Sequence, residues 1–221
     1  MKSKYKISQT NLDNTLLRLV LSPINKPLGT PLGGQYLYMS LGFFGQRHPF
    51  SVLDYNIVSG DIQLSIRVVG DFTDRISKLQ IGDKVNLDGY YGHYTQNLDT
   101  NTPTLLIAGG VGIVPFWSMI NKHPNNLNLI YCTSSLSDSV NLKTLSQLLG
   151  KRLNHHIGDQ NRLTPNDIKQ VIDTMIENDS NQKDKIQAYI CAGKNLTAMV
   201  NTELNQLGLN PKNIHIEEFG Y

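Results

Sequence analysis

The N-terminal part of the chain contains short runs in which apolar and polar residues alternate, with Gly, Pro and Asn between the runs. A period of two is typical of a strand with one buried and one solvated face. Between Lys4 and about Tyr94 the clearest runs are Leu16–Ser22, Gln35–Leu41, Arg47–Asp54, Ile62–Val69 and Lys84–Tyr90. Phe72–Leu79 instead places its apolar residues at the spacing of one helix face. This part of the chain predicts an antiparallel barrel or sandwich with one helical insertion.

The pattern changes after the polar segment Asn97–Pro103, where apolar strands begin to alternate with amphipathic helices. We expect strands at Leu105–Ala108, Asn128–Thr133, Leu153–Ile157, Gln187–Cys191 and Ile214–Phe219, helices at Val114–Lys122, Ser139–Leu149, Pro165–Ile176 and Leu196–Leu207, and a solvated loop at Glu177–Lys185. Such alternation requires right-handed crossovers and a parallel sheet. The predicted fold class is β + α/β, with an antiparallel barrel in residues 1–100 and a Rossmann-like parallel α/β domain in residues 101–221.

Composition and charge narrow the class of protein. The 221 residues are 39% hydrophobic and 17% charged, with a net charge of +2, which is ordinary for a soluble protein and does not indicate nucleic-acid binding. Cys132 and Cys191 are too few and too far apart for a zinc site or a four-cysteine cluster, so no metal site is expected. The longest uncharged run, Leu105–Ile120, is too short and too rich in Gly to span a bilayer. We therefore expect a cytoplasmic chain without a transmembrane segment.

The segment Leu105–Pro115 joins an apolar strand to a glycine-rich turn. Gly109, Gly110 and Gly112 would let the backbone approach a phosphate, and a helix beginning near Pro115 would present unpaired N–H groups. A dinucleotide pyrophosphate fits such a turn, although tight strand-to-helix turns also occur where nothing binds. Pro115 stands where the usual dinucleotide fingerprint has a third glycine.

This Gly-Gly-Val-Gly-Ile-Val-Pro segment, placed after a small barrel, resembles the ferredoxin–NADP reductase superfamily. Other segments resemble motifs of the superfamily in the same order, and the first of them resembles the ferric reductases and NADPH oxidases within it: His48–Ser51 (His-Pro-Phe-Ser), Arg67–Thr73, Asp88–Gly92, Tyr189–Gly193 and Glu217–Tyr221. The resemblance covers nearly the whole chain, and motifs that recur in order are far more specific than any single one.

The resemblance implies two cofactors, with FAD on the barrel of residues 1–100 and NAD(P)H on residues 101–221 as hydride donor. The implied FAD contacts are His48, Pro49, Phe50, Ser51, Arg67, Gly70, Asp71, Phe72 and Thr73. The turn N–H groups at Gly70–Thr73 would hold the FAD pyrophosphate, and Phe50 would lie against the isoalloxazine. The implied NAD(P)H contacts are Gly109, Gly110, Gly112, Pro115, Thr133, Cys191 and Gly193.

Three residues are the implied catalytic residues: Ser51, Cys191 and Tyr221. By resemblance, Ser51 would hydrogen-bond near flavin N5, and Cys191 would border the nicotinamide without acting as a nucleophile. The terminal Tyr221 would shield the flavin until nicotinamide displaces it. Taken without the resemblance, Ser51 and Cys191 are an ordinary strand hydroxyl and a buried thiol, and Tyr221 is an unused terminus.

The implied activity is hydride transfer from NAD(P)H to FAD, followed by electron transfer to a separate acceptor. That acceptor is a ferric chelate, a haem, a small redox protein, free flavin or oxygen. Ferric reductases and NADPH oxidases usually join this module to membrane haem helices, which this sequence lacks. The chain would then be a detached module, or would work with another polypeptide such as a membrane haem protein, docked at the inner face of the membrane.

Several residues depart from the superfamily pattern. His48 and Phe50 stand where the superfamily has Arg and Tyr, so Arg67 or Arg75 would supply the missing positive charge. Ala192 replaces the glycine of the Cys-Gly-Pro pattern. These substitutions leave open a second function, that of a non-catalytic flavin- or nucleotide-binding sensor.

The choice between NADH and NADPH also stays open. The hydroxyls of Thr133, Ser134 and Ser135 have no adjacent Arg or Lys, while Arg162 lies on a later loop.

Overall fold

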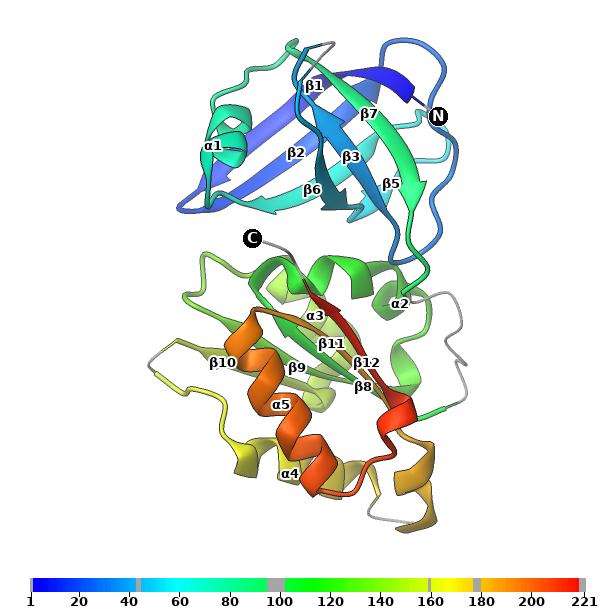
Figure 1. Cartoon of the computed structure of the whole chain (residues 1–221), viewed down its shortest axis with the longest axis vertical. Coiled ribbons are helices and arrows are strands. Elements are labelled where there is room, and N and C mark those ends of the chain that lie inside the picture. Colours follow the sequence, from blue (N-terminus) through cyan, green and yellow to red (C-terminus); the bar gives the residue numbers. More distant parts are fainter. Residues whose placement is uncertain (1, 43–44, 95–101, 159, 177–179, 219–221) are drawn as a thin grey trace. The chain divides into compact units, whose positions relative to one another are not determined.

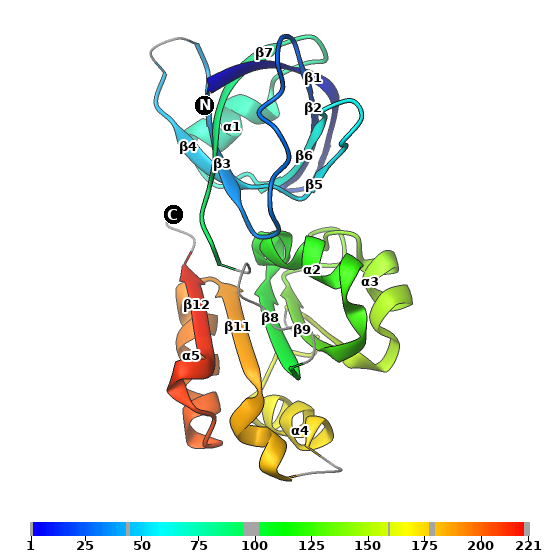
Figure 2. The same ribbon diagram turned by 90° about the vertical axis from the view of Figure 1, so that its right-hand side faces the viewer.

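The computed structural model describes residues 2–42, 45–94, 102–158, 160–176 and 180–218. These residues form two compact units, of which the first comprises Met1–Asn97 with Val114–Ser118 and the second Leu98–Ile113 with Met119–Tyr221. Each unit contains one sheet, as Figures 1 and 2 show. The β + α/β prediction is confirmed, because the first sheet is antiparallel and the second is parallel.

The sheet of the first unit has the strand order β4-β3-β7-β1-β2-β6-β5. Its strands are β1 (Lys2–Asp13), β2 (Leu16–Pro23), β3 (Tyr36–Ser40), β4 (His48–Ser51), β5 (Asp54–Tyr55), β6 (Ile62–Arg67) and β7 (Lys84–Tyr91). The expected single strand Arg47–Asp54 is wrong, since it forms β4 and β5. The break arises where the Val52 N–H bonds to the Gln35 carbonyl while the Leu53 N–H bonds to the Gln63 carbonyl in β6. This change of partner joins the two edges of the sheet and makes it barrel-like.

The core of the first unit follows the period of two. Along β1, the side chains of Tyr5 and Ile7 are buried, while those of the alternating Lys4 and Lys6 are exposed. The buried Tyr5 hydroxyl accepts a hydrogen bond from the Leu28 N–H at 3.1 Å, which satisfies its polar atom. Helix α1 (Asp71–Ser77) covers this core with Phe72 and Ile76, the residues whose spacing predicted a helix.

The second unit holds a parallel sheet with the strand order β10-β9-β8-β11-β12. Its elements are β8 (Thr104–Gly109), β9 (Leu127–Thr133), α3 (Leu142–Leu149), β10 (Leu153–Ile157), α4 (Pro165–Met175), β11 (Gln187–Ala192), α5 (Lys194–Gln206) and β12 (Ile214–Glu218), with short 3-10 helices at Pro124–Asn126, Gly150–Arg152 and Pro211–Asn213. Helices α4 and α5 pack on one face through a shared apolar cluster, and α3 lies against the other face (Figure 2). The chain leaves β8 toward β9 on one side and returns to β11 on the other. The carboxyl ends of β8 and β11 therefore form a topological switch point, where open α/β sheets bind ligands.

Three expected elements after residue 101 differ from the structure by more than two residues. The segment expected as a helix from Val114 begins earlier, as the 3-10 helix η1 (Gly110–Phe116), and becomes α-helical only in α2 (Trp117–Lys122). Pro115 lies inside η1, and its missing N–H is one reason that regular i to i−4 bonding does not start sooner. Helix α3 begins at Leu142 rather than Ser139 because Asn141 is left-handed, with φ 51°. Part of the expected loop is the 3-10 helix η4 (Ser180–Lys185).

None of the helices in the described part of the chain is long and apolar enough to cross a bilayer.

Candidate functional site

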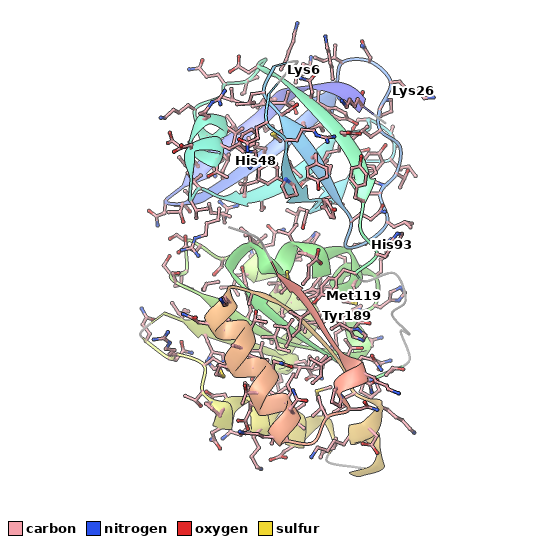
Figure 3. The ribbon with its side chains drawn as sticks, in the orientation of Figure 1. Lys6, Lys26, His48, His93, Met119 and Tyr189 are labelled. Atoms are coloured by element: carbon pink, nitrogen blue, oxygen red, sulfur yellow. The ribbon has the colours of Figure 1, made fainter. Side chains whose placement is uncertain are left out.

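Strand β4 carries the His-Pro-Phe-Ser motif, and its alternation decides which way each side chain faces. His48 pairs with Met39 and Phe50 with Leu37, both of them buried residues of β3. His48 and Phe50 therefore share the inner face, while Pro49 is exposed. The His48 ring stacks on Phe72 of α1 with centroids 3.9 Å apart, and the Phe50 ring lies 6.1 Å from Phe72 (Figure 3 labels His48).

This arrangement bears on two predicted flavin contacts. Phe50 packs against the barrel core, which is the environment of an ordinary core aromatic, and its role against a flavin stays a prediction. Nε2 of His48 is buried and has no hydrogen-bond partner among the described residues. A buried polar atom without a partner is costly, so this nitrogen is suited to a ligand oxygen. Ser51 ends the strand opposite Tyr36.

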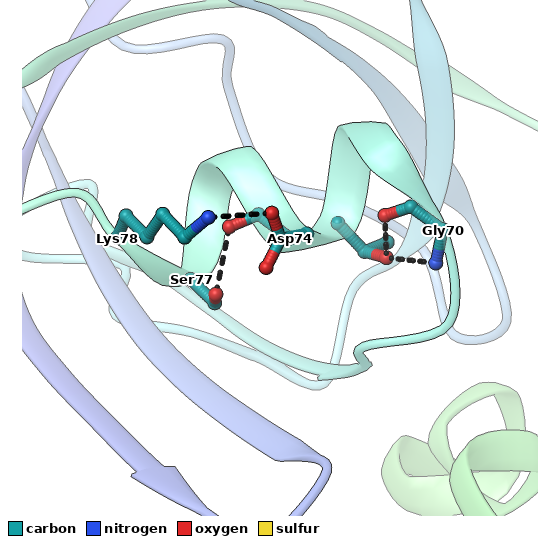
Figure 4. Close-up of polar contacts among 5 residues, drawn as sticks. Gly70, Asp74, Ser77 and Lys78 are labelled. Atoms are coloured by element: carbon teal, nitrogen blue, oxygen red, sulfur yellow. Dashed lines mark hydrogen bonds and ion pairs between the residues drawn. The ribbon is translucent and has the colours of Figure 1, made fainter.

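The turn at Gly70–Thr73 is closed by a threonine hydroxyl. Thr73 Oγ1 accepts from the N–H of Val69 at 2.9 Å. It also accepts from the Gly70 N–H at 3.0 Å and donates to the Gly70 carbonyl at 2.8 Å (Figure 4). The Gly70 N–H, expected to be free for a phosphate, is therefore already used within the protein. The N–H groups of Asp71, Phe72 and Thr73 begin α1 and have no carbonyl four residues earlier within the helix.

The space beside this turn is open and its surroundings are partly cationic. A Cβ added at Gly70 would meet no atom within 4 Å. Arg67 ends β6 in a half-buried position, Arg75 is exposed on α1, and neither forms an ion pair with a described residue. Farther along α1, Lys78 pairs with Asp74 at 2.7 Å, and the Ser77 hydroxyl donates to the Asp74 carbonyl (Figure 4). The turn therefore combines backbone donors, room and positive charge.

The glycines that follow β8 allow two backbones of the second unit to approach each other. A Cβ at Gly112 would lie 1.9 Å from the carbonyl oxygen of Cys191, and one at Gly109 would lie 3.0 Å from the Cβ of Ala192. Gly110 has φ 54°, in the region that favours glycine. Gly112 is therefore required by packing within the protein itself. Pro115 is buried inside η1, so it does not form the first exposed turn of a helix as expected.

A tyrosine hydroxyl ties the glycine segment to the loop after β9. Tyr131 donates to the Gly110 carbonyl at 3.1 Å and accepts from the Val140 N–H at 2.9 Å. The phenol thus holds the loop 134–141 beside the glycine segment. Tyr131 lies two residues before Thr133, and both side chains are buried on β9.

Polar side chains gather where β9 and β10 end. Thr133 Oγ1 lies 2.9 Å from Nε2 of His155, and the Ser135 hydroxyl donates to the Asp138 carboxylate at 2.9 Å. Burial lowers the pKa of His155, and the neighbouring His156 lowers it further, so the ring favours its neutral form. A neutral imidazole can accept from the Thr133 hydroxyl or donate to it. The cluster therefore places hydroxyls and one carboxylate at the carboxyl edge of the sheet.

A thiol and a carboxyl group lie side by side at the ends of β11 and β12. Cys191 is buried and pairs in register with Glu217. Burial and the charge of Glu217 both raise the pKa of the Cys191 thiol, which therefore stays protonated. Burial also raises the pKa of Glu217, whose Oε2 is buried without a hydrogen-bond partner among the described residues. This pair is unsuited to nucleophilic attack and suited to lining a ligand.

Gly193 begins α5 next to that pair. It is the N-cap residue of a helix of 13 residues, and a Cβ added there would meet no atom within 4 Å. The first N–H groups of α5 lie at the switch point of the sheet and have no carbonyl four residues earlier within the helix. Gly193 and Gly112 are thus different kinds of glycine, because only Gly112 is enclosed by the protein.

The chain is similar to known proteins in sequence and in structure. No protein-family model matches the chain. Flavohemoprotein B of Dictyostelium discoideum is 29% identical over 157 residues, which is 65% of this chain and 37% of that protein. Sulfhydrogenase 2 subunit gamma of Pyrococcus furiosus is 28% identical over 203 residues, which is 83% of this chain and 70% of the subunit. The chain therefore spans little more than a third of the flavohemoprotein and over two thirds of the hydrogenase subunit.

Among solved structures, a ferredoxin NADP+ reductase from Neisseria gonorrhoeae with bound FAD and NADP superimposes with a TM-score of 0.79. The two chains are 16% identical, and the match covers 98% of each. These likenesses show that the chain has the fold of the ferredoxin NADP+ reductase. The fold that the resemblance of the sequence motifs implies is thereby confirmed.

The structure brings most of the sequence-predicted residues into two groups. His48, Phe50 and Phe72 meet in the first unit, next to the Gly70 turn. Gly109, Gly110, Gly112, Cys191 and Gly193 meet in the second unit at the carboxyl ends of β8 and β11, and Thr133 ends the neighbouring β9. Tyr221 lies outside the described residues.

Four residues of these sites were missed by sequence reasoning: Tyr131, Asp138, His155 and Glu217. His155 meets Thr133 only because β9 and β10 are adjacent in register, so no local spacing signals the pair. Glu217 was noted as part of a terminal motif, but its position opposite Cys191 depends on the pairing of β11 with β12. A polar side chain at the predicted carboxyl end of a strand was the one signal available for Asp138 and Glu217.

Proposed function

We propose that this chain is a flavoprotein reductase that binds FAD on the first unit and NAD(P)H on the second. In this proposal, hydride passes from NAD(P)H to FAD, and the electrons go to a separate acceptor. The observation that carries the proposal is the convergence of Gly109–Gly112, Cys191 and Gly193 at the switch point of the parallel sheet. The FAD and NADP bound by the N. gonorrhoeae reductase, whose fold this chain shares, support it.

The residues of the first unit fit an FAD pyrophosphate. The N–H groups of Asp71–Thr73, the room beside Gly70 and the charge of Arg67 offer donors and positive potential to an anion. The unpartnered Nε2 of His48 offers a further polar contact. Thr73 would act by holding the turn, because its hydroxyl already binds the Val69 and Gly70 N–H groups. Pro49, Phe50 and Ser51 would border the isoalloxazine.

The residues of the second unit fit a dinucleotide. The first N–H groups of α5 and the open space at Gly193 would receive the pyrophosphate, with Gly109 and Gly110 beside it. Gly112 and Pro115 would shape the segment from within the fold rather than touch a phosphate. Thr133 would help to position the adenosine end of the dinucleotide.

When bound, FAD accepts a hydride and releases its electrons onward, and the protein supplies orientation and exclusion of water. Cys191 would orient the nicotinamide as a neutral thiol, because its raised pKa keeps it protonated. Ser51 Oγ would hold the proton that accompanies reduction. Tyr221 would cover the flavin in the absence of dinucleotide.

We propose further that NADH is preferred to NADPH. The Asp138 carboxylate accepts from Ser135 in the loop after β9, which Tyr131 ties to the glycine segment. A carboxylate in this part of a dinucleotide-binding fold accepts from a ribose 2′-hydroxyl and repels a 2′-phosphate. The sequence alone left this choice open, because it did not show which residues of the loop come together.

For the electron acceptor we propose a chemical class and not a single molecule. The names of the two relatives indicate two arrangements, a haem in one protein and separate subunits in the other. A haem or a redox protein is therefore a better candidate than a free ferric chelate.

Anaerobic stopped-flow spectroscopy of the purified, FAD-reconstituted chain tests the proposal. We expect a yellow protein whose flavin absorbance bleaches on mixing with NADH, and more slowly with NADPH. Acid release followed by chromatography should identify the flavin as FAD. A bound flavin that stays oxidised with both dinucleotides would refute the reductase and favour the sensor, while recovery of FMN alone would refute the pyrophosphate site.

A further inference from the structure

The outer face of β1 carries a row of lysines. Lys2, Lys4 and Lys6 are exposed at alternate positions, and the intervening Tyr5 is buried. Lys6 stands directly opposite the exposed Lys84 of β7. Like charges at directly opposed positions of a sheet are destabilising, and none of these lysines forms an ion pair with a described residue. Their positive charge is therefore available to a partner.

The segment after β2 extends this face. The N–H of Ile24 bonds to the Lys4 carbonyl at 2.9 Å, and the Ser3 hydroxyl donates to the Lys26 carbonyl at 2.5 Å. These contacts continue the β1–β2 register and place exposed Ile24 and Lys26 beside the lysine row. Lys6 and Lys26 both lie at the periphery of the first unit in Figure 3.

An apolar tip adjoins this basic face. In the turn between β5 and β6, Ile57 is 75% exposed and Val58 is 92% exposed. Asn56 Oδ1 accepts from the N–H of Val58 at 2.9 Å and from that of Ser59 at 3.1 Å, which holds the turn in shape. The turn also packs on the segment that bears Lys26, since a Cβ at Gly60 would lie 2.9 Å from the Cβ of Pro27. The two aliphatic side chains are therefore presented to solvent by a constrained loop.

Carboxylates near this surface are few and partly engaged. Asp83 adjoins Lys84, but its carboxylate accepts from the Gln80 N–H at 2.8 Å. Asp61 ends the apolar turn and is half-buried. Asp88 stands directly opposite Lys2, but it is buried and forms an ion pair with Arg47 at 2.9 Å. The surface thus combines lysines with aliphatic tips, which are the two features that anchor a protein at an anionic lipid surface.

We propose that this surface, made of Lys2, Lys4, Lys6, Lys26 and Lys84 with Ile24, Ile57 and Val58, docks the chain on an anionic membrane. The lysines would attract the headgroups, and the tip of the β5–β6 turn would enter the interface between headgroups and acyl chains. An acidic protein would account for the lysines but leave two highly exposed aliphatic side chains unexplained. The proposal does not depend on reductase chemistry.

Flotation of the full chain with vesicles tests the proposal. We expect binding to phosphatidylcholine vesicles that contain phosphatidylserine, little binding to phosphatidylcholine alone, and weakening by salt. The variant Lys4→Gln/Lys6→Gln/Lys26→Gln should bind about 100-fold more weakly, at roughly fivefold per lysine. The variant Ile57→Ser/Val58→Ser should lose about tenfold or more.

Matched controls come from exposed residues of the second unit. Lys143→Gln/Lys151→Gln/Lys212→Gln removes the same charge, and Leu136→Ser removes an aliphatic side chain that is 62% exposed. Neither control should change vesicle binding.

The proposal is overturned if the parent chain binds vesicles with and without phosphatidylserine equally, or if the control variants lose as much vesicle binding as the lysine variant. Loss in the lysine variant alone would show that Ile57 and Val58 do not enter the lipid, and would overturn the proposed mode of docking. Circular dichroism verifies folding, and flavin reduction by NADH, measured in parallel, reports separately on the reductase proposal.

Discussion

Replacing Gly112 by alanine tests whether the glycine segment is shaped by the protein or by a ligand. The added Cβ would lie 1.9 Å from the Cys191 carbonyl oxygen and 2.8 Å from its carbonyl carbon. An ordinary C···O contact is about 3.3 Å, so the two backbones must separate by roughly 1.4 Å. Overpacking of this kind costs about 1–3 kcal/mol. For a chain of this size, each kcal/mol lowers Tm by about 2–4 °C.

The same displacement should impair dinucleotide chemistry. A shift of about 1 Å in a positioning group costs on the order of 100-fold in rate. We therefore expect Gly112→Ala to bind FAD, to have a Tm several degrees below that of the parent, and to show flavin reduction by NADH that is about 100-fold slower. Differential scanning fluorimetry and anaerobic stopped-flow spectroscopy measure the two effects.

Gly193→Ala provides the size-matched comparison. A Cβ at Gly193 meets no atom within 4 Å, and its φ of −68° is open to any residue. This variant should keep a Tm close to that of the parent, and any loss of NADH affinity would then report contact with the ligand itself. Equal Tm values for Gly112→Ala and the parent, with unchanged reduction rates, would show that the backbones at Gly112 and Cys191 are not in the contact described.

Three further predictions address the remaining elements. Thr73→Val should raise the Kd for FAD about fivefold to 30-fold, because a cap hydroxyl contributes about 1–2 kcal/mol. Ser77→Ala on the same helix should leave that Kd unchanged. Equal Kd values for Thr73→Val and the parent, measured by fluorescence quenching, would contradict the role of the turn. Asp138→Ala should lower kcat/KM for NADH about tenfold or more and raise it for NADPH, and an unaltered ratio would exclude the carboxylate as selector. The pKa of native His155 lies below 6.5, so the unfolded chain binds its proton first and stability falls as the pH drops through 6.5. His155→Gln should therefore flatten the decline of Tm with falling pH between about pH 8 and pH 5, and a slope equal to that of the parent would refute this.

The fold could be predicted from sequence where the apolar period is regular. Leu153–Ile157 was expected as a strand and forms β10 with the same bounds. Prediction failed where tertiary contacts override the local pattern. Arg47–Asp54 reads as one strand, but its hydrogen bonds change from Gln35 to Gln63 within two residues, and no local pattern encodes that change of partner.

The candidate sites show the same division. Motif order located the glycine segment and the end of β11, because strand ends are local features of the sequence. The distinction between an enclosed Gly112 and an open Gly193 could not be predicted, since it depends on Cys191 approaching from a strand far along the chain. The contact of Thr133 with His155 depends likewise on the register of β9 against β10.

The second unit has polar groups without hydrogen-bond partners among the described residues at the place where a ligand would bind. Glu217 is buried beside Cys191 with one carboxylate oxygen unpartnered among the described residues, and its pKa is raised as a result. Burial of an unpaired acceptor costs about 1–3 kcal/mol, which a stable core would avoid by placing an apolar side chain there. The carboxylate stands at the carboxyl edge of a parallel sheet, next to the free N–H groups that begin α5. A ligand that has both donors and acceptors would satisfy these groups. A nicotinamide dinucleotide is such a ligand, because its carboxamide can donate to the carboxylate and its phosphates can accept from the N–H groups. The polarity of this edge therefore argues for dinucleotide binding independently of the glycine motif.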